Sequence, residues 1–240
     1  MTVGEEAKTI RYLVPSSNEW TSLSSSSEED KDEITKKKEE LKNALLSSLQ
    51  MQNICVLTGS GSSLGSVVKG PSMNDLWQKA AYDKNDVINT SVQEIANKIN
   101  FDTSAKRPNI EEFLSLCDAY LQFKDDEDIK NLVNDFKSVI LKECSFVNDD
   151  TILTGHEIFL HRLSRRRVRD SRLKIFTTNY DSCFERSAGK LGLVVLDGFS
   201  FTQPRFYDPR FFSYDIVRRP KTGEDLGNYL EGVIQLYKLH

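Results

Sequence analysis

The sequence lacks the features that would place the chain in a membrane or outside the cell. No apolar run approaches the roughly 20 residues that a transmembrane helix needs, and the amino terminus lacks the charged and then apolar order of a secretory signal. Cysteines are few and none are closely spaced: Cys55, Cys117, Cys144 and Cys183. We therefore expect a soluble cytoplasmic protein without a zinc site or a disulfide framework, in which the cysteines are small core residues.

An excess of positive charge is also missing. The 240 residues include 32 Lys and Arg against 36 Asp and Glu, a formal net charge of −4, which argues against nucleic-acid binding through overall charge. One local group of cations extends from Arg162 to Lys174, at the end of a predicted helix. Because cations favour a helix carboxyl end, a solvated basic face is one interpretation; a contact of the Arg165–Arg169 patch with a partner or with DNA is the other.

The chain is long enough for one sizeable core or two small ones. Residues 1–32 contain the run Ser24 to Ser27, several acidic side chains and few large apolar ones, so we expect a flexible tail there. From Glu33, apolar residues at helical spacing lead into Ile54–Leu57, which has the pattern of a fully buried strand.

Apolar residues recur at helical spacing over most of the segment 86–169, for example at Ile110, Phe113 and Cys117. Short apolar strands are predicted after this segment, at residues 173–176, 193–196 and 233–239. This order predicts an α/β fold with a Rossmann-like parallel sheet and a helical insertion over about residues 86–169.

Polar and glycine residues directly follow two of the predicted strands. The loop Thr58–Gly65, Thr-Gly-Ser-Gly-Ser-Ser-Leu-Gly, follows the first, and the cluster Thr177–Asp181 follows Leu173–Phe176. Open α/β sheets bind ligands at the carboxyl ends of their strands, and glycines let the backbone approach a pyrophosphate. Taken alone, Thr178 or Asn179 could equally be the cap of a helix that ends at Gly192.

The glycine spacing differs from that of two common nucleotide loops. Gly59, Gly61 and Gly65 occupy positions one, three and seven, whereas the dinucleotide fingerprint needs one, three and six. No acidic residue closes a following strand about 20 positions later, as a dehydrogenase would need, and the loop has no Gly-Lys-Ser ending. These absences argue against a hydride-transfer enzyme and an ATP-hydrolysing phosphate loop.

Five segments together resemble the sirtuin-like NAD-cleaving proteins of bacterial antiphage defence. They are Ile54–Gly65, Gly70–Trp77, Asn109–Ser115, Phe176–Asp181 and Leu236–His240. Leu153–Gly155 and Leu196–Ser200 are similar to the branch that partners a HerA-type hexameric ATPase. The resemblance implies a sirtuin-like domain over residues 33–240 that binds NAD as its substrate, needs no zinc and acts as a homo-oligomer.

The resemblance also implies roles for single residues. Asn179 would contact ribose hydroxyls or an attacking water, Asp181 would hold the nicotinamide carboxamide or orient the loop, and His240 would be the general base. NAD would be lined by Thr58, Gly59, Ser60, Gly61, Ser63, Thr178 and Asn179. His156 and His161 are expected to be structural or exposed.

Two departures from the family pattern stand out. Ser60 replaces the alanine of the usual Gly-Ala-Gly, which we expect to be tolerated. In the family the catalytic histidine is followed by a glycine and by the rest of the nucleotide fold, whereas this sequence stops at His240. The resemblance therefore implies a fold that is truncated at its carboxyl end.

The expected function is that of an NAD+ glycohydrolase, which releases nicotinamide and ADP-ribose as an antiphage effector in complex with a HerA-type ATPase. Two alternatives stay open. One is a non-catalytic NAD or ADP-ribose sensor or assembly module, since a fold does not determine function. The other is an NAD-dependent protein deacylase, against which the missing paired zinc cysteines and the segment Gly70–Trp77 argue.

Overall fold

The computed structural model describes residues 11–13, 18–23, 31–65, 67–167, 170–218 and 228–239. By its internal contacts the chain divides into two units, Met1–Ile54 and Cys55–His240. The first unit therefore includes the helix that begins at Lys31, whereas the domain implied by the family resemblance, residues 33–240, contains nearly all of this helix.

The first unit contains two short strands and one helix. Strands β1 (Arg11–Tyr12) and β2 (Thr21–Ser22) pair in antiparallel fashion, and helix α1 spans Lys31–Leu49. The buried Tyr12 joins them, because its hydroxyl lies 3.2 Å from both the Lys37 carbonyl oxygen and a Glu40 carboxylate oxygen. Most of residues 1–32 lie outside the described residues, so a flexible tail stays a prediction for them.

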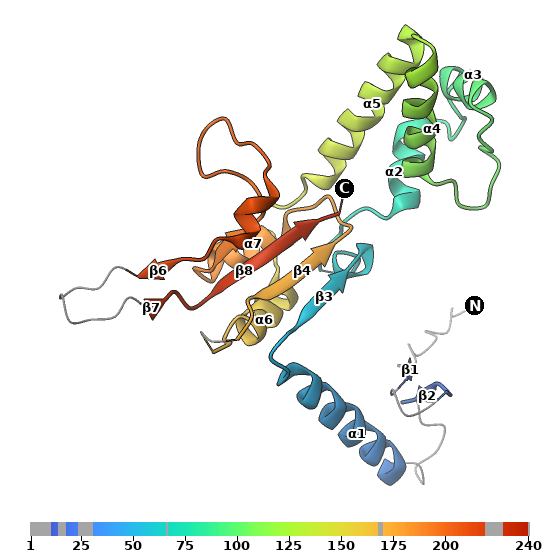
Figure 1. Cartoon of the computed structure of the whole chain (residues 1–240). Helices are drawn as coiled ribbons and strands as arrows, with labels where there is room; N and C mark the ends of the chain where they lie inside the picture. Colours follow the sequence, from blue (N-terminus) through green and yellow to red (C-terminus); the bar gives the residue numbers. More distant parts are fainter. Residues whose placement is uncertain are drawn as a thin grey trace. The chain divides into compact units, whose positions relative to one another are not determined.

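The second unit is built around a four-stranded parallel sheet with the order β3-β4-β8-β5 (Figure 1). Its strands are β3 (Cys55–Thr58), β4 (Leu173–Thr177), β5 (Val194–Leu196) and β8 (Val233–Lys238). Thr177 pairs with Thr58 on one side and with Lys238 on the other, so β3, β4 and β8 end at the same edge. This confirms the expected α/β fold class with a Rossmann-like parallel sheet.

Two helices pack together on one face of this sheet, α6 (Thr154–Leu163) and α7 (Cys183–Lys190) (Figure 1). The ring of Phe184 on α7 meets the rings of His156 and Phe159 on α6 edge to face. Gly192 follows α7 with φ of +68°, which only glycine adopts readily, as expected for a helix end. Although α6 falls within the predicted insertion, it belongs to the layer beside the sheet.

The opposite face carries a stack of aromatic rings. Tyr237 of β8 lies between Phe176 of β4 and Phe212, with centroid distances of 4.5 and 3.9 Å. Phe212 belongs to the short helix η3 (Pro209–Ser213), whose backbone accepts a 2.6 Å hydrogen bond from the Gln235 side chain. This contact covers the β8 side of the face, whereas Leu57 of β3 is exposed.

The prediction of a fully buried first strand is wrong. Among the described strands, β3 pairs with β4 alone and so lies at an edge of the sheet, and its Leu57 is 74% exposed. Cys55 on the same strand is also exposed, whereas the other three cysteines are buried as expected. An apolar run cannot distinguish an edge strand from a central one, because the two differ in neighbours rather than in composition.

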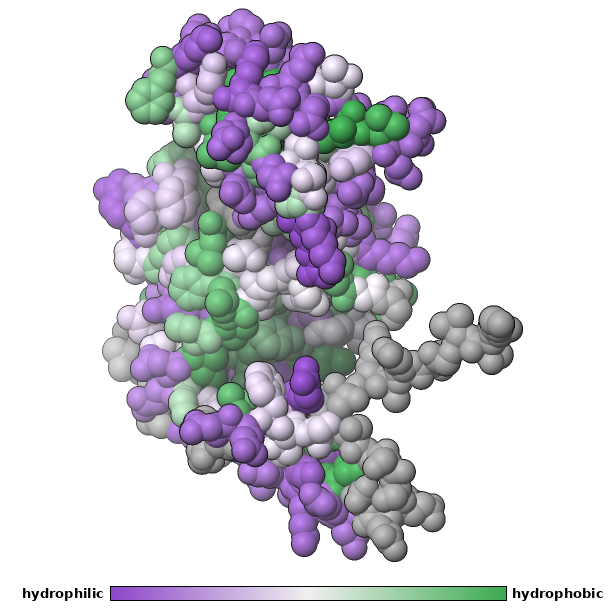
Figure 2. Space-filling model, turned by 90° about the vertical axis from the view of Figure 1, so that its right-hand side faces the viewer, coloured by the Kyte–Doolittle hydropathy of each residue, from purple (hydrophilic) through white to green (hydrophobic). Residues whose placement is uncertain are grey.

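Four helices gather beyond the carboxyl edge of the sheet (Figure 1): α2 (Met73–Ala81), α3 (Thr90–Lys98), α4 (Ile110–Phe123) and α5 (Glu127–Cys144). They surround a core in which Phe113 lies 5.4 Å from Trp77 and 5.1 Å from Phe136, centroid to centroid. The part of their surface seen at the top of Figure 2 is mostly hydrophilic. The chain therefore leaves the sheet after β3, builds a separate apolar core, and returns through α6 to β4.

The remaining described strands, β6 (Val217–Arg218) and β7 (Asn228–Tyr229), form a short antiparallel pair. Among the described helices, none is both long and apolar enough to cross a bilayer.

Candidate functional site

The glycine loop begins where β3 ends. Gly59 is extended, and Ser60–Ser62 form a single 3₁₀ turn, η2. The backbone N–H groups of Ser62 and Ser63 are bonded back into the loop at 2.9 and 3.0 Å, whereas no described residue accepts from the N–H groups of Ser60 and Gly61. The loop therefore has two donors available for an anionic ligand.

The loop after β4 runs directly beside the glycine loop. The Thr178 N–H donates to the Thr58 carbonyl oxygen at 3.1 Å, and a Cβ at Gly59 would lie 3.3 Å from the Thr178 hydroxyl oxygen. Helix α7 begins only at Cys183. Neither Thr178 nor Asn179 is therefore its cap, and the alternative interpretation of the cluster as a helix start is wrong.

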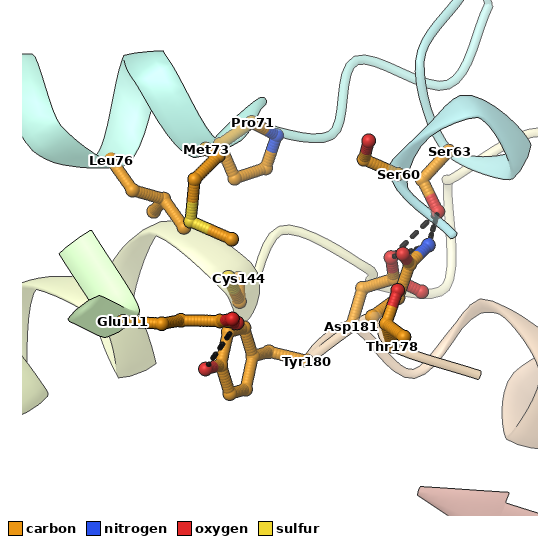
Figure 3. Close-up of a pocket in the computed structure, with 11 residues that line it drawn as sticks. Ser60, Ser63, Pro71, Met73, Leu76, Glu111, Cys144, Thr178, Tyr180 and Asp181 are labelled. Atoms are coloured by element: carbon orange, nitrogen blue, oxygen red, sulfur yellow. Dashed lines mark hydrogen bonds between the residues drawn. The ribbon is translucent and has the colours of Figure 1, made fainter. Parts of the chain in front are cut away.

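Three polar side chains from the two loops, Ser63, Asn179 and Asp181, form a buried network (Figure 3). Each of the three residues is at most 8% exposed. The Ser63 hydroxyl donates to Asp181 Oδ2 at 2.6 Å, and the Asn179 amide nitrogen lies 3.0 Å from Ser63 Oγ and 3.1 Å from Asp181 Oδ2. Two segments more than a hundred residues apart are joined here by hydrogen bonds that the interior strengthens.

The Asp181 carboxylate stays ionised inside this network. Burial by itself would raise its pKa, but hydrogen bonds from the Ser63 hydroxyl and the Cys183 backbone N–H, with the charge of Lys238, hold the pKa below its ordinary value. The Lys238 ammonium also donates to the Asp181 carbonyl oxygen and pairs with Glu185 at 3.1 Å. The end of β8 is thereby tied to the loop after β4.

A cavity of about 230 Å³ adjoins the network (Figure 3). One wall is polar and comes from the strand ends: Ser60, Ser63, Thr178, Asn179 and Asp181. The other wall is largely apolar. It is formed by Pro71 just before α2, by Met73 and Leu76 of α2, and by Cys144 at the end of α5. A cavity with an apolar wall and a few converging polar groups is typical of a small-molecule site.

Tyr180 and Glu111 complete the lining where the helices meet the loop after β4. The Tyr180 hydroxyl donates to a Glu111 carboxylate oxygen at 3.0 Å (Figure 3). Burial and this neighbouring carboxylate raise the pKa of Tyr180, so its hydroxyl stays neutral. With Asp181 the lining holds two carboxylates, and within the described residues it includes no lysine, arginine or histidine. The cavity is therefore suited to a ligand group with positive charge.

A second cavity of about 630 Å³ shares Ser60 and Met73 with the first. Its lining includes Lys106 and Arg107, which form no ion pair with any residue of the described ranges. The two adjoining cavities thus differ in charge, one with carboxylates and the other with cations.

The structure brings together five of the residues that the sequence assigned to the site. Ser60, Ser63, Thr178, Asn179 and Asp181 line the first cavity, and Gly59 and Gly61 belong to its loop. Thr58 instead lines a separate, aromatic cavity.

His156 lines that aromatic cavity too, and it is buried, in line with the structural role expected for it. His240 lies outside the described residues, so its role as a base stays a prediction. The preceding residue, Leu239, donates its N–H to the Thr177 carbonyl oxygen at 3.0 Å.

Sequence reasoning missed the apolar wall and the Glu111–Tyr180 contact. Glu111 and Tyr180 lie in segments that carry the family resemblance, but a single sequence does not indicate that α4 meets the loop after β4. Sequence reasoning also missed Gly70, at which a Cβ would lie 2.9 Å from Ser63 Cβ.

The described residues of the basic cluster at 162–174 do not line the cavity. Arg172 forms a bidentate pair with Asp215, its closest contact being 2.8 Å, and Arg166 donates to the Ser171 carbonyl oxygen. Arg169 lies outside the described residues. Because Arg166 and Arg172 bond within the chain, the structure favours the interpretation that this cluster is a solvated basic face. A contact with DNA or a partner protein stays a prediction.

No model of a known protein family matches this chain, and no curated protein matches it significantly. Within the described part of the chain, no group of three or more His, Cys, Asp or Glu side chains could hold a metal ion.

Proposed function

We propose that the protein is an NAD+ glycohydrolase. In this reaction the bond between C1′ of the ribose and the nicotinamide nitrogen breaks, and its electron pair leaves with nicotinamide. Water bonds to C1′, its proton is released, and ADP-ribose is the second product. The observation that carries the proposal is the buried Asn179, held in a carboxylate-lined cavity at the carboxyl ends of two parallel strands.

The charge of the first cavity suits the nicotinamide end of NAD. The nicotinamide ring of NAD+ is cationic, and the transition state of its departure carries positive charge on the ribose, as in glycoside hydrolysis. The Glu111 carboxylate lies in the lining and would stabilise both charges. Met73 and Leu76 offer an apolar surface to the ring.

The pyrophosphate would extend from this cavity over the glycine loop. The N–H groups of Ser60 and Gly61, from which no described residue accepts, are suitable donors for phosphate oxygens. Lys106 and Arg107 in the adjoining cavity supply the positive charge that the first cavity lacks. NAD would thus have its cationic ring beside carboxylates and its phosphates beside cations.

We propose His240 as the general base that takes a proton from a ribose hydroxyl or water. Because nicotinamide is already a good leaving group, positioning and charge stabilisation contribute more to this reaction than proton transfer does.

The biological part of the proposal is an antiphage effector that works in the cytoplasm as a homo-oligomer with a HerA-type ATPase. It is supported by the motif resemblance alone. Co-purification of the two proteins from a co-expressing strain tests the partnership. Phage plating on strains that carry wild-type protein or Asn179→Ala tests the role, since only the wild type should protect.

The enzymatic test follows nicotinamide release from NAD by chromatography. We expect the wild type, with its partner ATPase if needed, to release nicotinamide and ADP-ribose, and Asn179→Ala to release at least about 100-fold less. A matched control is Asn134→Ala, at an exposed position on α5. Equal release by wild type and Asn179→Ala would overturn the proposal. NAD binding without turnover would favour the sensor, and acetyl-ADP-ribose formed from an acetylated peptide would favour the deacylase.

A further inference from the structure

The hydrogen bonds around Asn179 determine which end of its amide faces the cavity. An ionised carboxylate only accepts hydrogen bonds, so the Asn179 atom 3.1 Å from Asp181 Oδ2 must be the NH₂ group. The same group lies 3.0 Å from Ser63 Oγ and 3.1 Å from Ser62 Oγ. All donor capacity of the amide is therefore directed into the protein.

The other end of the amide is free. No described residue donates to Asn179 Oδ1, although the side chain is 8% exposed and lines the cavity. An amide oxygen accepts hydrogen bonds and cannot donate them. The group that Asn179 contacts must therefore carry an O–H or N–H donor.

Both oxygens of Asp181 accept hydrogen bonds from the protein. Oδ2 accepts from Ser63 and Asn179, and Oδ1 accepts from the Cys183 backbone N–H at 3.0 Å. This arrangement differs from the role implied by the family resemblance, in which Asp181 could hold the nicotinamide carboxamide. Three hydrogen bonds from the protein thus fix the carboxylate in place, and two of them come from Ser63 and Asn179.

We infer that Asp181 and Ser63 are positioning residues, which hold the Asn179 amide with its oxygen toward the cavity, where it accepts from a ribose hydroxyl or from the attacking water. The identity of that donor depends on the proposed NAD cleavage. The orientation of the amide does not depend on it, so the two parts can fail separately.

The chemical reason is that the amide has two nearly isosteric orientations. If it turned over, Oδ1 would face the Asp181 carboxylate, and an NH₂ group would meet the hydroxyl that it has to accept from. In Asp181→Asn a single amide oxygen replaces two acceptors, so either the Cys183 N–H or the Ser63 and Asn179 pair loses its partner. The turned orientation of Asn179 then becomes accessible.

The first experiment measures the orientation directly and needs no activity. In protein labelled with ¹⁵N-asparagine, the Asn179 side-chain NH₂ signal is identified by its loss in Asn179→Ala, and its exchange with water is measured. We expect slow exchange in the wild type and exchange at least about tenfold faster in Asp181→Asn.

The control is Asp83→Asn, which alters a carboxylate that accepts from two backbone N–H groups in an exposed turn. Asp83→Asn should leave the Asn179 signal unchanged. Ser63→Ala serves as a second variant, should Asp181→Asn fail to fold. Unchanged exchange in both site variants would overturn the positioning role, whatever the substrate is.

The second experiment is a double-mutant cycle on nicotinamide release. Asp181→Asn should lower kcat about 30-fold or more and change KM less than about threefold, since it affects a residue that acts in the transition state. In the Asn179→Ala background it should lower kcat no further, because its effect passes through Asn179.

If the double variant loses kcat by the product of the two single-variant factors, Asp181 acts on the substrate itself, and the inference is overturned. If the wild type does not cleave NAD, the proposed function fails while the exchange measurement still decides the orientation.

Discussion

The helical core and the polar network of the second unit are both buried, but different forces hold them. The core around Trp77, Phe113 and Phe136 depends on apolar contact, which has little directional preference. The network of Ser63, Asn179 and Asp181 depends on hydrogen bonds that each need a particular partner at a particular angle. The helical core supplies stability and tolerates the replacement of one apolar side chain by another of similar volume. In the polar network, by contrast, a change of one atom alters what the cavity can bind.

The largest expected effect tests the claim that the helical core supplies stability. Phe136→Ala should lower the free energy of unfolding by about 3–5 kcal/mol, because a fully buried ring is lost and a cavity remains. Urea denaturation measures the change. The matched control, Phe123→Ala, removes a ring that is 93% exposed and should change stability by about 0.5 kcal/mol or less. Equal losses in both variants would contradict the account of the core.

Two glycines near the first cavity separate an effect on stability from an effect on ligand binding. A Cβ at Gly70 would lie 2.9 Å from Ser63 Cβ, so Gly70→Ala should cost about 1–3 kcal/mol of stability. Apart from its two chain neighbours, no described residue has an atom within 4 Å of a Cβ at Gly61.

Gly61→Ala should therefore fold normally and weaken NAD binding about tenfold, because its methyl group lies beside the free N–H donors. Urea denaturation and calorimetry separate the two effects. If Gly61→Ala lost stability and kept its affinity for NAD, the proposed phosphate position would be wrong.

The smallest expected effect concerns the second cavity, whose lining includes Lys106 and Arg107. The double variant Lys106→Ala, Arg107→Ala should raise KM for NAD about tenfold and leave kcat within about twofold, since these cations would contact phosphate equally in the ground and transition states. Steady-state kinetics at two salt concentrations measures it. Lys84→Ala, Lys137→Ala removes the same charge elsewhere and should change KM little. A KM that changed equally in both variants would indicate only a net-charge effect.

The sequence predicted the elements that composition determines. The strand that begins at Leu173, the end of α7 near Gly192 and the helical stripes of α4 and α5 follow from apolar periodicity and from the conformational freedom of glycine. It also indicated the two loops that meet at the site, because polar residues at the ends of parallel strands share one edge of a sheet. The α/β class and the meeting of the two loops therefore follow from the amino-acid pattern, whereas the individual site residues around Asn179 were assigned through the family resemblance.

What the sequence could not predict depends on neighbours in space. β3 has the apolar composition of a central strand, yet it lies at an edge with Leu57 exposed. Tyr180 meets Glu111 only because α4 packs near the loop after β4, a contact between residues far apart in the chain. The orientation of the Asn179 amide is set by Asp181 and Ser63, and no spacing rule describes such a network.

The most direct test of the central claim is the ratio of kcat for nicotinamide release between the wild type and Asn179→Ala, with both proteins shown to be folded by urea denaturation. We predict a ratio of at least about 100, with Asn134→Ala equal to the wild type. A ratio near one would contradict the claim that this carboxylate-lined cavity cleaves NAD.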